Sequence, residues 1–143
     1  MKFKYDPQDG WTFIETIIVI GIVLILTSSV GFMAFRYIDK AKSVTAKNEI
    51  ENFSLALNTY FLDCQVFPLE DQGLFALWEK PSSDSDGWDG PYVTKKPGND
   101  PWDNEYEYTV PGPNGLPFGL RSFGSDKMEG GEGDSKDVSS WEG

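Results

Sequence analysis

Carboxylates alternate with glycines between residues 123 and 138, near the end of the chain. The acidic side chains of this segment are Asp126, Glu129, Glu132, Asp134 and Asp137. Calcium takes about six to eight oxygen ligands from carboxylates and backbone carbonyls, and a glycine-rich loop can turn its carbonyls inward to supply them. The segment lacks the EF-hand spacing. By composition alone it is therefore more typical of a solvated acidic tail than of a calcium site.

A second carboxylate, Glu15, stands directly before an uncharged and mostly apolar run over residues 16–35. About twenty apolar residues are enough for a helix to span a bilayer, and an ionisable group in such a segment is costly unless it has a partner. In the alternative interpretation, Glu15 lies at the membrane interface, where the helix dipole favours a carboxylate in the first turn. A secretory signal peptide fits poorly, because cleavage at Gly10 would leave the apolar helix on the mature chain.

The composition restricts the function classes. The chain has 143 residues, with 12 basic and 23 acidic side chains and a formal net charge of −11, which argues against binding of nucleic acid. Histidine is absent, so imidazole catalysis and the common zinc sites are excluded. Cys64 is the single cysteine and cannot form a disulfide within the chain, so we expect a small buried residue rather than a nucleophile or an intermolecular bridge. These features predict a protein that is not an enzyme.

The periodicity of apolar residues predicts the elements that position these groups. One continuous helix is expected from about residue 12 to 62, because its second half has a stripe at three- and four-residue steps that would pack under a sheet; the stripe includes Ala46, Ile50, Phe53, Leu57 and Cys64. Residues 67–81 are predicted to form a loop, a short helix and a stop. Residues 82–98 are predicted to form a loop with a brief extended piece, whose Trp88 and Tyr92 pack onto the domain rather than bind sugar.

Two strands are predicted after this loop. Tyr106, Tyr108 and Val110 alternate with polar residues, as in a half-buried strand, and residues 118–123 supply the next strand after a reversal over residues 111–115. The expected fold class is α+β, in which a long N-terminal helix, membrane-spanning in its first half and amphipathic in its second, packs on a small antiparallel sheet.

Several motifs resemble those of a known family. Residues 10–15, Gly-Trp-Thr-Phe-Ile-Glu, look like the prepilin signal of type IV pilins and pseudopilins. Residues 67–81, the Asp-Pro-Trp segment with its following tyrosines, and the Gly-Gly-Glu-Gly loop resemble the major pseudopilin family of type II secretion. The resemblance implies a pilin-like fold, cleavage by prepilin peptidase after Gly10, and N-methylation of Trp11. It also implies that Glu15 serves filament assembly, by neutralising the Trp11 ammonium of another copy.

The same resemblance reverses the interpretation of the acidic segment. It implies a structural calcium ion, held by the side chains of Asp126, Asp134 and Asp137 and by the backbone carbonyls of Phe123, Ser125 and Met128. The implied organisation is a leader over residues 1–10, a transmembrane or filament-core helix over 11–35, an amphipathic helical half over 36–64, and a globular part with the calcium loop over 65–143.

The implied function is that of a structural subunit of a periplasmic pseudopilus, which helps to drive folded proteins across the outer membrane. The implied partners are other copies of the chain, minor pseudopilins, the inner-membrane assembly platform and prepilin peptidase. The family places the subunit in the inner membrane with its C-terminal part in the periplasm, whereas a count of Arg36, Lys40 and Lys42 after the span favours the reverse orientation. Two alternatives are a type IV pilin subunit and a membrane-tethered calcium-dependent hydrolase or sugar-binding module that uses Trp88 and Trp102.

Overall fold

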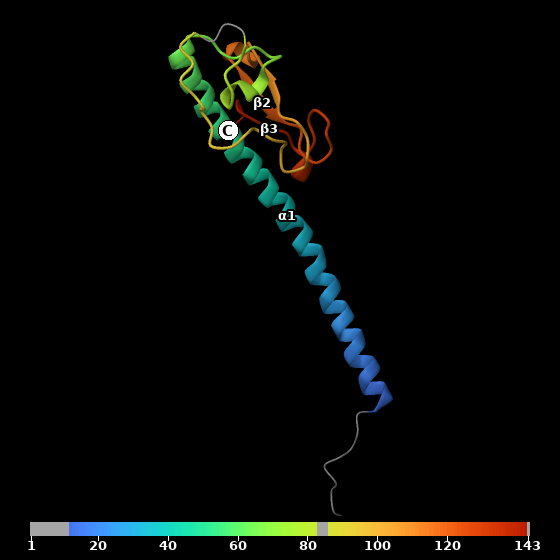
Figure 1. The fold of residues 1–143 in the computed structure, drawn as a ribbon. Coiled ribbons are helices and arrows are strands. Elements are labelled where there is room, and N and C mark those ends of the chain that lie inside the picture. The colour runs from blue at the N-terminus through green and yellow to red at the C-terminus, as the bar shows by residue number, and fades with distance from the viewer. Residues whose placement is uncertain (1–11, 83–85, 143) are drawn as a thin grey trace, which may run out of the picture. The chain divides into compact units, whose positions relative to one another are not determined.

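A single long α-helix opens the fold of this chain (Figure 1). The computed structural model describes residues 12–82 and 86–142, without the side chains of Ser29, residues 32–36 and Asp134. The helix, α1, runs over Phe13–Cys64, which confirms the prediction of one helix from about residue 12 to 62. The chain divides into two compact units, Met1–Ile38 and Asp39–Gly143.

In the first unit, most of the described side chains of α1 are apolar and exposed. Exposed members include Ile17, Ile20, Leu24, Ile25 and Val30. Within the part of the chain that the structure describes, no helix is both long and apolar enough to cross a membrane.

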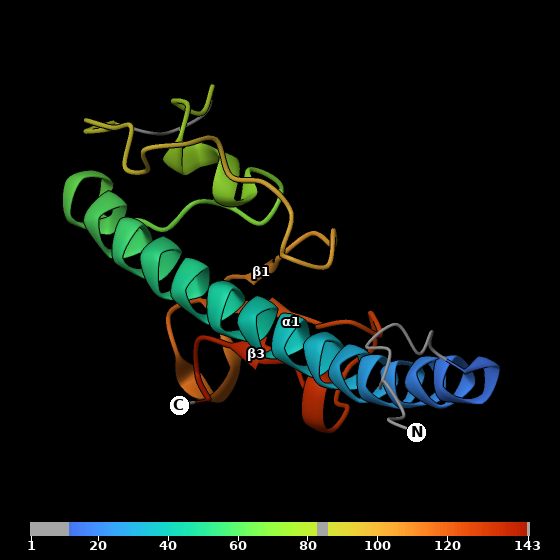
Figure 2. The same cartoon turned by 90° about the horizontal axis from the view of Figure 1, so that it is seen from below.

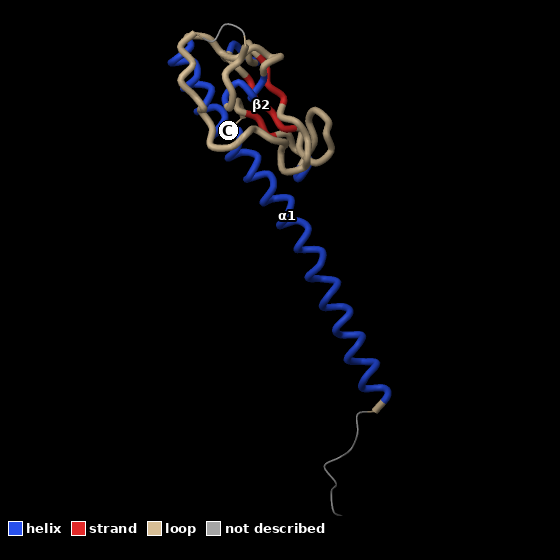
Figure 3. The backbone as a smooth tube through the Cα atoms, viewed as in Figure 1, coloured by secondary structure: helices blue, strands red, loops and turns tan. Residues whose placement is uncertain are grey.

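The second unit contains a small antiparallel sheet (Figure 3). Its strands are β1 (Glu107–Thr109), β2 (Gly119–Ser122) and β3 (Val138–Ser139), which lie in the order β1-β2-β3. The first two confirm the predicted strands, and the turn between them contains the 3₁₀ helix η2 (Pro113–Gly115). The register places Glu107 opposite Arg121, and Arg121 opposite Ser139, so these three side chains share one face of the sheet.

The opposite face of the sheet contributes to the core with the second half of α1 (Figure 2). Buried residues of the predicted stripe, Ile50 and Leu57, join Tyr60 in one cluster with Tyr108 and Leu120 of the sheet. The 3₁₀ helix η1 (Gly73–Leu77) adds Leu74, Ala76 and Leu77, which confirms the short helix predicted after the loop. Because burying one large apolar side chain stabilises a fold by about 1.5–3 kcal/mol, this cluster is the main source of stability in the unit.

Trp88 and Tyr92 pack onto the domain, as predicted. The indole Nε1 of Trp88 donates to the carbonyl of Ala76 at 3.0 Å, and the hydroxyl of Tyr92 donates to Asp63 at 2.9 Å. Residues 86–98 contain no assigned strand, so the brief extended piece expected there does not pair with the sheet. Cys64 also packs against the core but is half-buried rather than fully buried.

Candidate functional site

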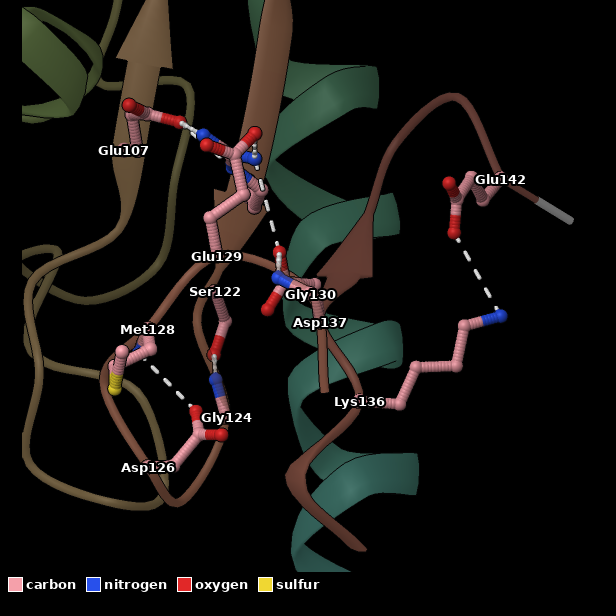
Figure 4. A network of polar contacts seen from close by, with 11 residues as sticks. Glu107, Ser122, Gly124, Asp126, Met128, Glu129, Gly130, Lys136, Asp137 and Glu142 are labelled. Atoms are coloured by element: carbon pink, nitrogen blue, oxygen red, sulfur yellow. Dashed lines mark hydrogen bonds and ion pairs between the residues drawn. The ribbon is translucent and has the colours of Figure 1, made fainter. Parts of the chain in front are cut away.

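The acidic segment forms the connection between β2 and β3, and its middle is bonded to its C-terminal end (Figure 4). The backbone N–H of Asp137 donates to the carbonyl of Gly130 at 3.2 Å, and the N–H of Gly130 donates to Oδ2 of Asp137 at 3.0 Å. A second contact joins the early and late parts of the loop, where the hydroxyls of Ser125 and Ser135 lie 3.1 Å apart. The segment is therefore a closed loop with internal hydrogen bonds, and not an extended acidic tail.

Arg121 of β2 attaches this loop to the sheet. Its guanidinium lies 2.7 Å from a carboxylate oxygen of Glu107 on β1 and 2.7 Å from Glu129 in the loop. A third carboxylate, that of Asp137, lies 3.7 Å away, and the ring of Phe123 lies under the guanidinium, 4.5 Å from its centroid. Burial would lower the pKa of Arg121, but the hydrogen bonds to Glu129 and Glu107 raise the pKa above its ordinary value. The arginine thus stays charged and neutralises part of the loop.

Of the predicted carboxylate ligands, the structure describes the side chains of Asp126 and Asp137, which lie on different parts of the loop. Asp126 is exposed, and its Oδ1 accepts from the backbone N–H of Met128 at 3.1 Å, on a part of the loop away from Asp137 (Figure 4). The side chain of Asp134, in the 3₁₀ helix η3 (Gly133–Ser135), lies outside the described residues. Among the side chains that are described, no group of three or more His, Cys, Asp or Glu residues could hold a metal ion.

One atom of the loop nevertheless fits a cation. Oδ1 of Asp137 is buried and has no hydrogen-bond partner among the residues that the structure describes, although the other oxygen of this carboxylate accepts from Gly130. Buried polar atoms are nearly always paired, so an unpartnered carboxylate oxygen indicates a missing partner. The available donors are carboxylate, hydroxyl and carbonyl oxygens, which are the ligands that calcium prefers.

The contacts of Arg121 lead to a prediction about the loop in calcium-free protein. We expect Arg121→Gln to lower the free energy of unfolding by about 1–2 kcal/mol, because Glu107 and Asp137 lose their partner. The exposed Glu129 contributes little, since water screens its ion pair. Urea denaturation of the calcium-free protein measures the change. Lys136→Gln is the matched control, because its pair with Glu142 is long, at 3.7 Å, and exposed. Equal stability of the two variants would contradict the role of Arg121.

Glu15, the predicted assembly residue, lies in the first turn of α1 and bonds to the residue that caps the helix. Its carboxylate accepts from the backbone N–H and from the hydroxyl of Thr12, both at 3.2 Å, and its own N–H donates to that hydroxyl at 3.3 Å. This reciprocal pair is a capping box, which satisfies free backbone N–H groups at the start of the helix. The Thr-x-x-Glu spacing was a signal for it in the sequence. The processing residues, Gly10 and Trp11, lie outside the described residues.

The role of Arg121 is the main feature that sequence reasoning missed. From the sequence, Arg121 was only a residue of a predicted strand, because no motif or short spacing links it to Glu107 or Glu129. The connection depends on strand register, which puts Glu107 directly across from Arg121. Opposite charges at facing positions of neighbouring predicted strands are the only signal that could have indicated it.

The arrangement of a long N-terminal helix, a small antiparallel sheet and an acidic loop before the last strand defines the pseudopilin class of fold. The structure is similar to the crystal structure of the major pseudopilin from the type 2 secretion system of enterohaemorrhagic Escherichia coli, with a TM-score of 0.58 and 29% identity, over 72% of this chain and 89% of that one. Residues 33–141 match the family described as Type II secretion system (T2SS), protein G. The chain belongs to this family.

Curated relatives agree with this assignment over nearly the whole chain. The type II secretion system core protein G of Pseudomonas aeruginosa is 38% identical over 137 residues, which cover 94% of this chain and 96% of that protein. The protein of the same name from Vibrio cholerae is 36% identical over 140 residues, which cover 96% of this chain and 94% of that protein.

Proposed function

We propose that this chain is a structural subunit of the periplasmic pseudopilus of a type II secretion system. The observation that carries the proposal is the similarity to core protein G over 94% of the chain, which includes the N-terminal helix as well as the globular unit. The role is mechanical and involves no catalysis by the chain: subunits add to a filament, which helps to move folded proteins across the outer membrane.

The apolar first part of α1 supports assembly through this helix. Its exposed side chains lie on all sides of the helix, and a helix that is apolar all round requires lipid or other protein around it. We propose that the uncharged run over residues 16–35 lies in the inner membrane before assembly and in the filament core afterwards. The globular unit is then periplasmic, in the orientation of the family and against the simple count of flanking cations.

The proposed processing and assembly steps involve the N-terminus and Glu15. Prepilin peptidase cuts after Gly10, and the new N-terminal residue, Trp11, is methylated. In the filament, the Glu15 carboxylate of one copy neutralises the Trp11 ammonium of its neighbour, because an ion in apolar surroundings needs an opposite charge. The assembly platform of the inner membrane and minor pseudopilins are the further partners.

We also propose that the acidic loop holds a structural calcium ion. The unpartnered Oδ1 of Asp137 and the hard oxygen donors of the loop support this proposal. The carboxylates come from Asp126, Asp134 and Asp137, and the backbone carbonyls come from Phe123, Ser125 and Met128. A bound cation would offset the negative charge that Arg121 leaves uncompensated and would hold the loop closed.

Deletion of the gene tests the proposed function. We expect exoproteins to accumulate in the periplasm of the deletion strain and secretion to return with the wild-type gene, while twitching motility and DNA uptake are unchanged. The measurement is immunoblotting of periplasm and culture medium. Normal secretion together with lost motility or DNA uptake would instead identify a type IV pilin.

A further inference from the structure

We infer that Asp100, through Ser122 and Asn104, is a positioning residue that orients the Phe123–Gly124 peptide at the entrance of the acidic loop. The inference rests on the proposed calcium loop, because the Phe123 carbonyl is one of the proposed calcium ligands and must point toward the ion. In the sequence, the Asp-Pro-Trp segment that contains Asp100 indicates only a turn before a strand. The structure places this turn against the start of the acidic loop, with contacts between residues 20 and 22 positions apart in the chain.

Asp100 is buried, with 5% of its surface exposed, and both of its carboxylate oxygens accept hydrogen bonds. Oδ1 accepts from the backbone N–H groups of Trp102 at 3.0 Å and Asn104 at 2.8 Å. The backbone N–H of Asp100 donates in turn to the carbonyl of Asn104 at 2.7 Å, which closes the turn. Oδ2 accepts from the hydroxyl of Ser122, the last residue of β2. One carboxylate therefore fixes both the turn and the hydroxyl of a fully buried serine.

Gly124 is held at both of its backbone groups by residues that Asp100 fixes. Its N–H donates to the hydroxyl oxygen of Ser122 at 3.2 Å, and its carbonyl accepts from Nδ2 of Asn104 at 2.9 Å. Because the serine hydrogen is used toward Asp100, the oxygen is left to accept from Gly124. The two bonds fix the peptide groups on either side of the Gly124 Cα.

The direction of the Phe123 carbonyl follows from these bonds. A peptide group is planar, and in the trans form its C=O and N–H point in opposite directions. The N–H of Gly124 and the carbonyl of Phe123 belong to the same peptide, so the bond to Ser122 turns that carbonyl away from Ser122. This is one of the carbonyls proposed to bind calcium, and groups that orient metal ligands commonly affect metal affinity.

Gly124 itself permits this geometry. Its φ of +64° lies in the left-handed region, and a Cβ at this position would stand 3.2 Å from the carbonyl oxygen of Lys136 and 3.3 Å from that of Ser135. The start of the loop thus passes close to the backbone of its other end. Orienting Gly124 therefore orients the loop where the proposed carbonyl ligand approaches the backbone of Ser135 and Lys136.

The test compares Asn104→Ala with Asn99→Ala in the mature full-length protein in detergent. Both variants remove one asparagine amide from the same turn. Nδ2 of Asn99 donates to Asp103 at 2.9 Å within the turn, whereas Nδ2 of Asn104 donates into the loop. Calorimetric titration with calcium should show binding about 10- to 100-fold weaker for Asn104→Ala and unchanged for Asn99→Ala. Asp100→Asn, which keeps an acceptor for the turn but loses the acceptor for Ser122, should weaken binding in the same way.

Hydrogen exchange in chelator gives a readout that does not depend on calcium. We expect the amide of Gly124 to exchange at least about tenfold faster in Asn104→Ala and in Asp100→Asn than in wild type or Asn99→Ala, since loss of a bond lowers local protection. Equal calcium affinity and equal exchange in all four proteins would overturn the inference and leave the calcium proposal intact. Absence of calcium binding by wild type would overturn the calcium proposal, and the exchange rates would then still decide whether Asp100 and Asn104 position Gly124.

Discussion

Glu15→Ala is expected to abolish filament assembly while membrane insertion and cleavage after Gly10 proceed normally. The reason is electrostatic, because the Trp11 ammonium of a neighbouring copy would enter apolar surroundings without an opposite charge, at a cost of about 3–5 kcal/mol per interface. The measurement is the yield of sheared filaments from cells that overproduce the variant, together with the processed fraction on immunoblots. Normal filaments would reduce Glu15 to a helix-capping residue.

Two further variants separate charge from capping. Glu15→Gln keeps a side chain that can complete a capping box but removes the charge, so we expect it to fail in assembly like Glu15→Ala. Thr12→Ala removes the hydroxyl that bonds to Glu15 but keeps the carboxylate, so it should weaken the start of α1 by about 1 kcal/mol and still assemble. The opposite pattern, with assembly by Glu15→Gln and none by Thr12→Ala, would assign the function of Glu15 to the cap.

Asp137→Ala is expected to abolish the stabilisation of the protein by calcium. A ligand at about one hundred times its dissociation constant stabilises the folded state by about 2.7 kcal/mol, which corresponds to a shift of the melting temperature of roughly 10–20 °C for a domain of this size. Wild-type protein should show this difference between calcium and chelator, and Asp137→Ala and Asp126→Ala should not. Thermal unfolding followed by circular dichroism measures both conditions.

Glu142→Ala is the matched control for this experiment. Glu142 is an acidic residue close to the same loop in the chain, and its described ion pair is an exposed contact of 3.7 Å with Lys136. Its loss should change stability by less than about 0.5 kcal/mol and leave the calcium effect in place. Melting curves of Asp126→Ala and Asp137→Ala that respond to chelator as wild type does would remove both residues from the ligand set.

The parts of the fold that local patterns encode were predicted from the sequence. The stripe that includes Ile50 and Leu57 repeats at helical steps, and it becomes the buried face of α1. Tyr108 lies between polar neighbours and becomes the buried residue of β1. In both cases the side-chain period of the element decides which residues face the core, so a few neighbouring residues carry enough information.

The candidate site was predicted less completely. The alternation of acids and glycines drew attention to the loop, but only the family resemblance implied a joint role for Asp126 and Asp137, which lie on different parts of the loop in Figure 4. It also gave no sign of Arg121, whose partners come from another strand and from the loop. Contacts of this kind depend on register and loop closure, which residues distant in sequence determine together.

By itself, the sequence determined the apolar segment over residues 16–35, the acidic residue before it, the helix and two of the strands, and the family resemblance, because each depends on residue types at short fixed spacings. Only the tertiary structure decided that Arg121 contacts carboxylates from another strand and from the loop, and that Asp100 reaches Gly124 through Ser122 and Asn104. The physical reason is the range of the forces involved. Hydrogen bonds and close ion pairs act over a few ångströms, so they exist only after folding has brought their partners together.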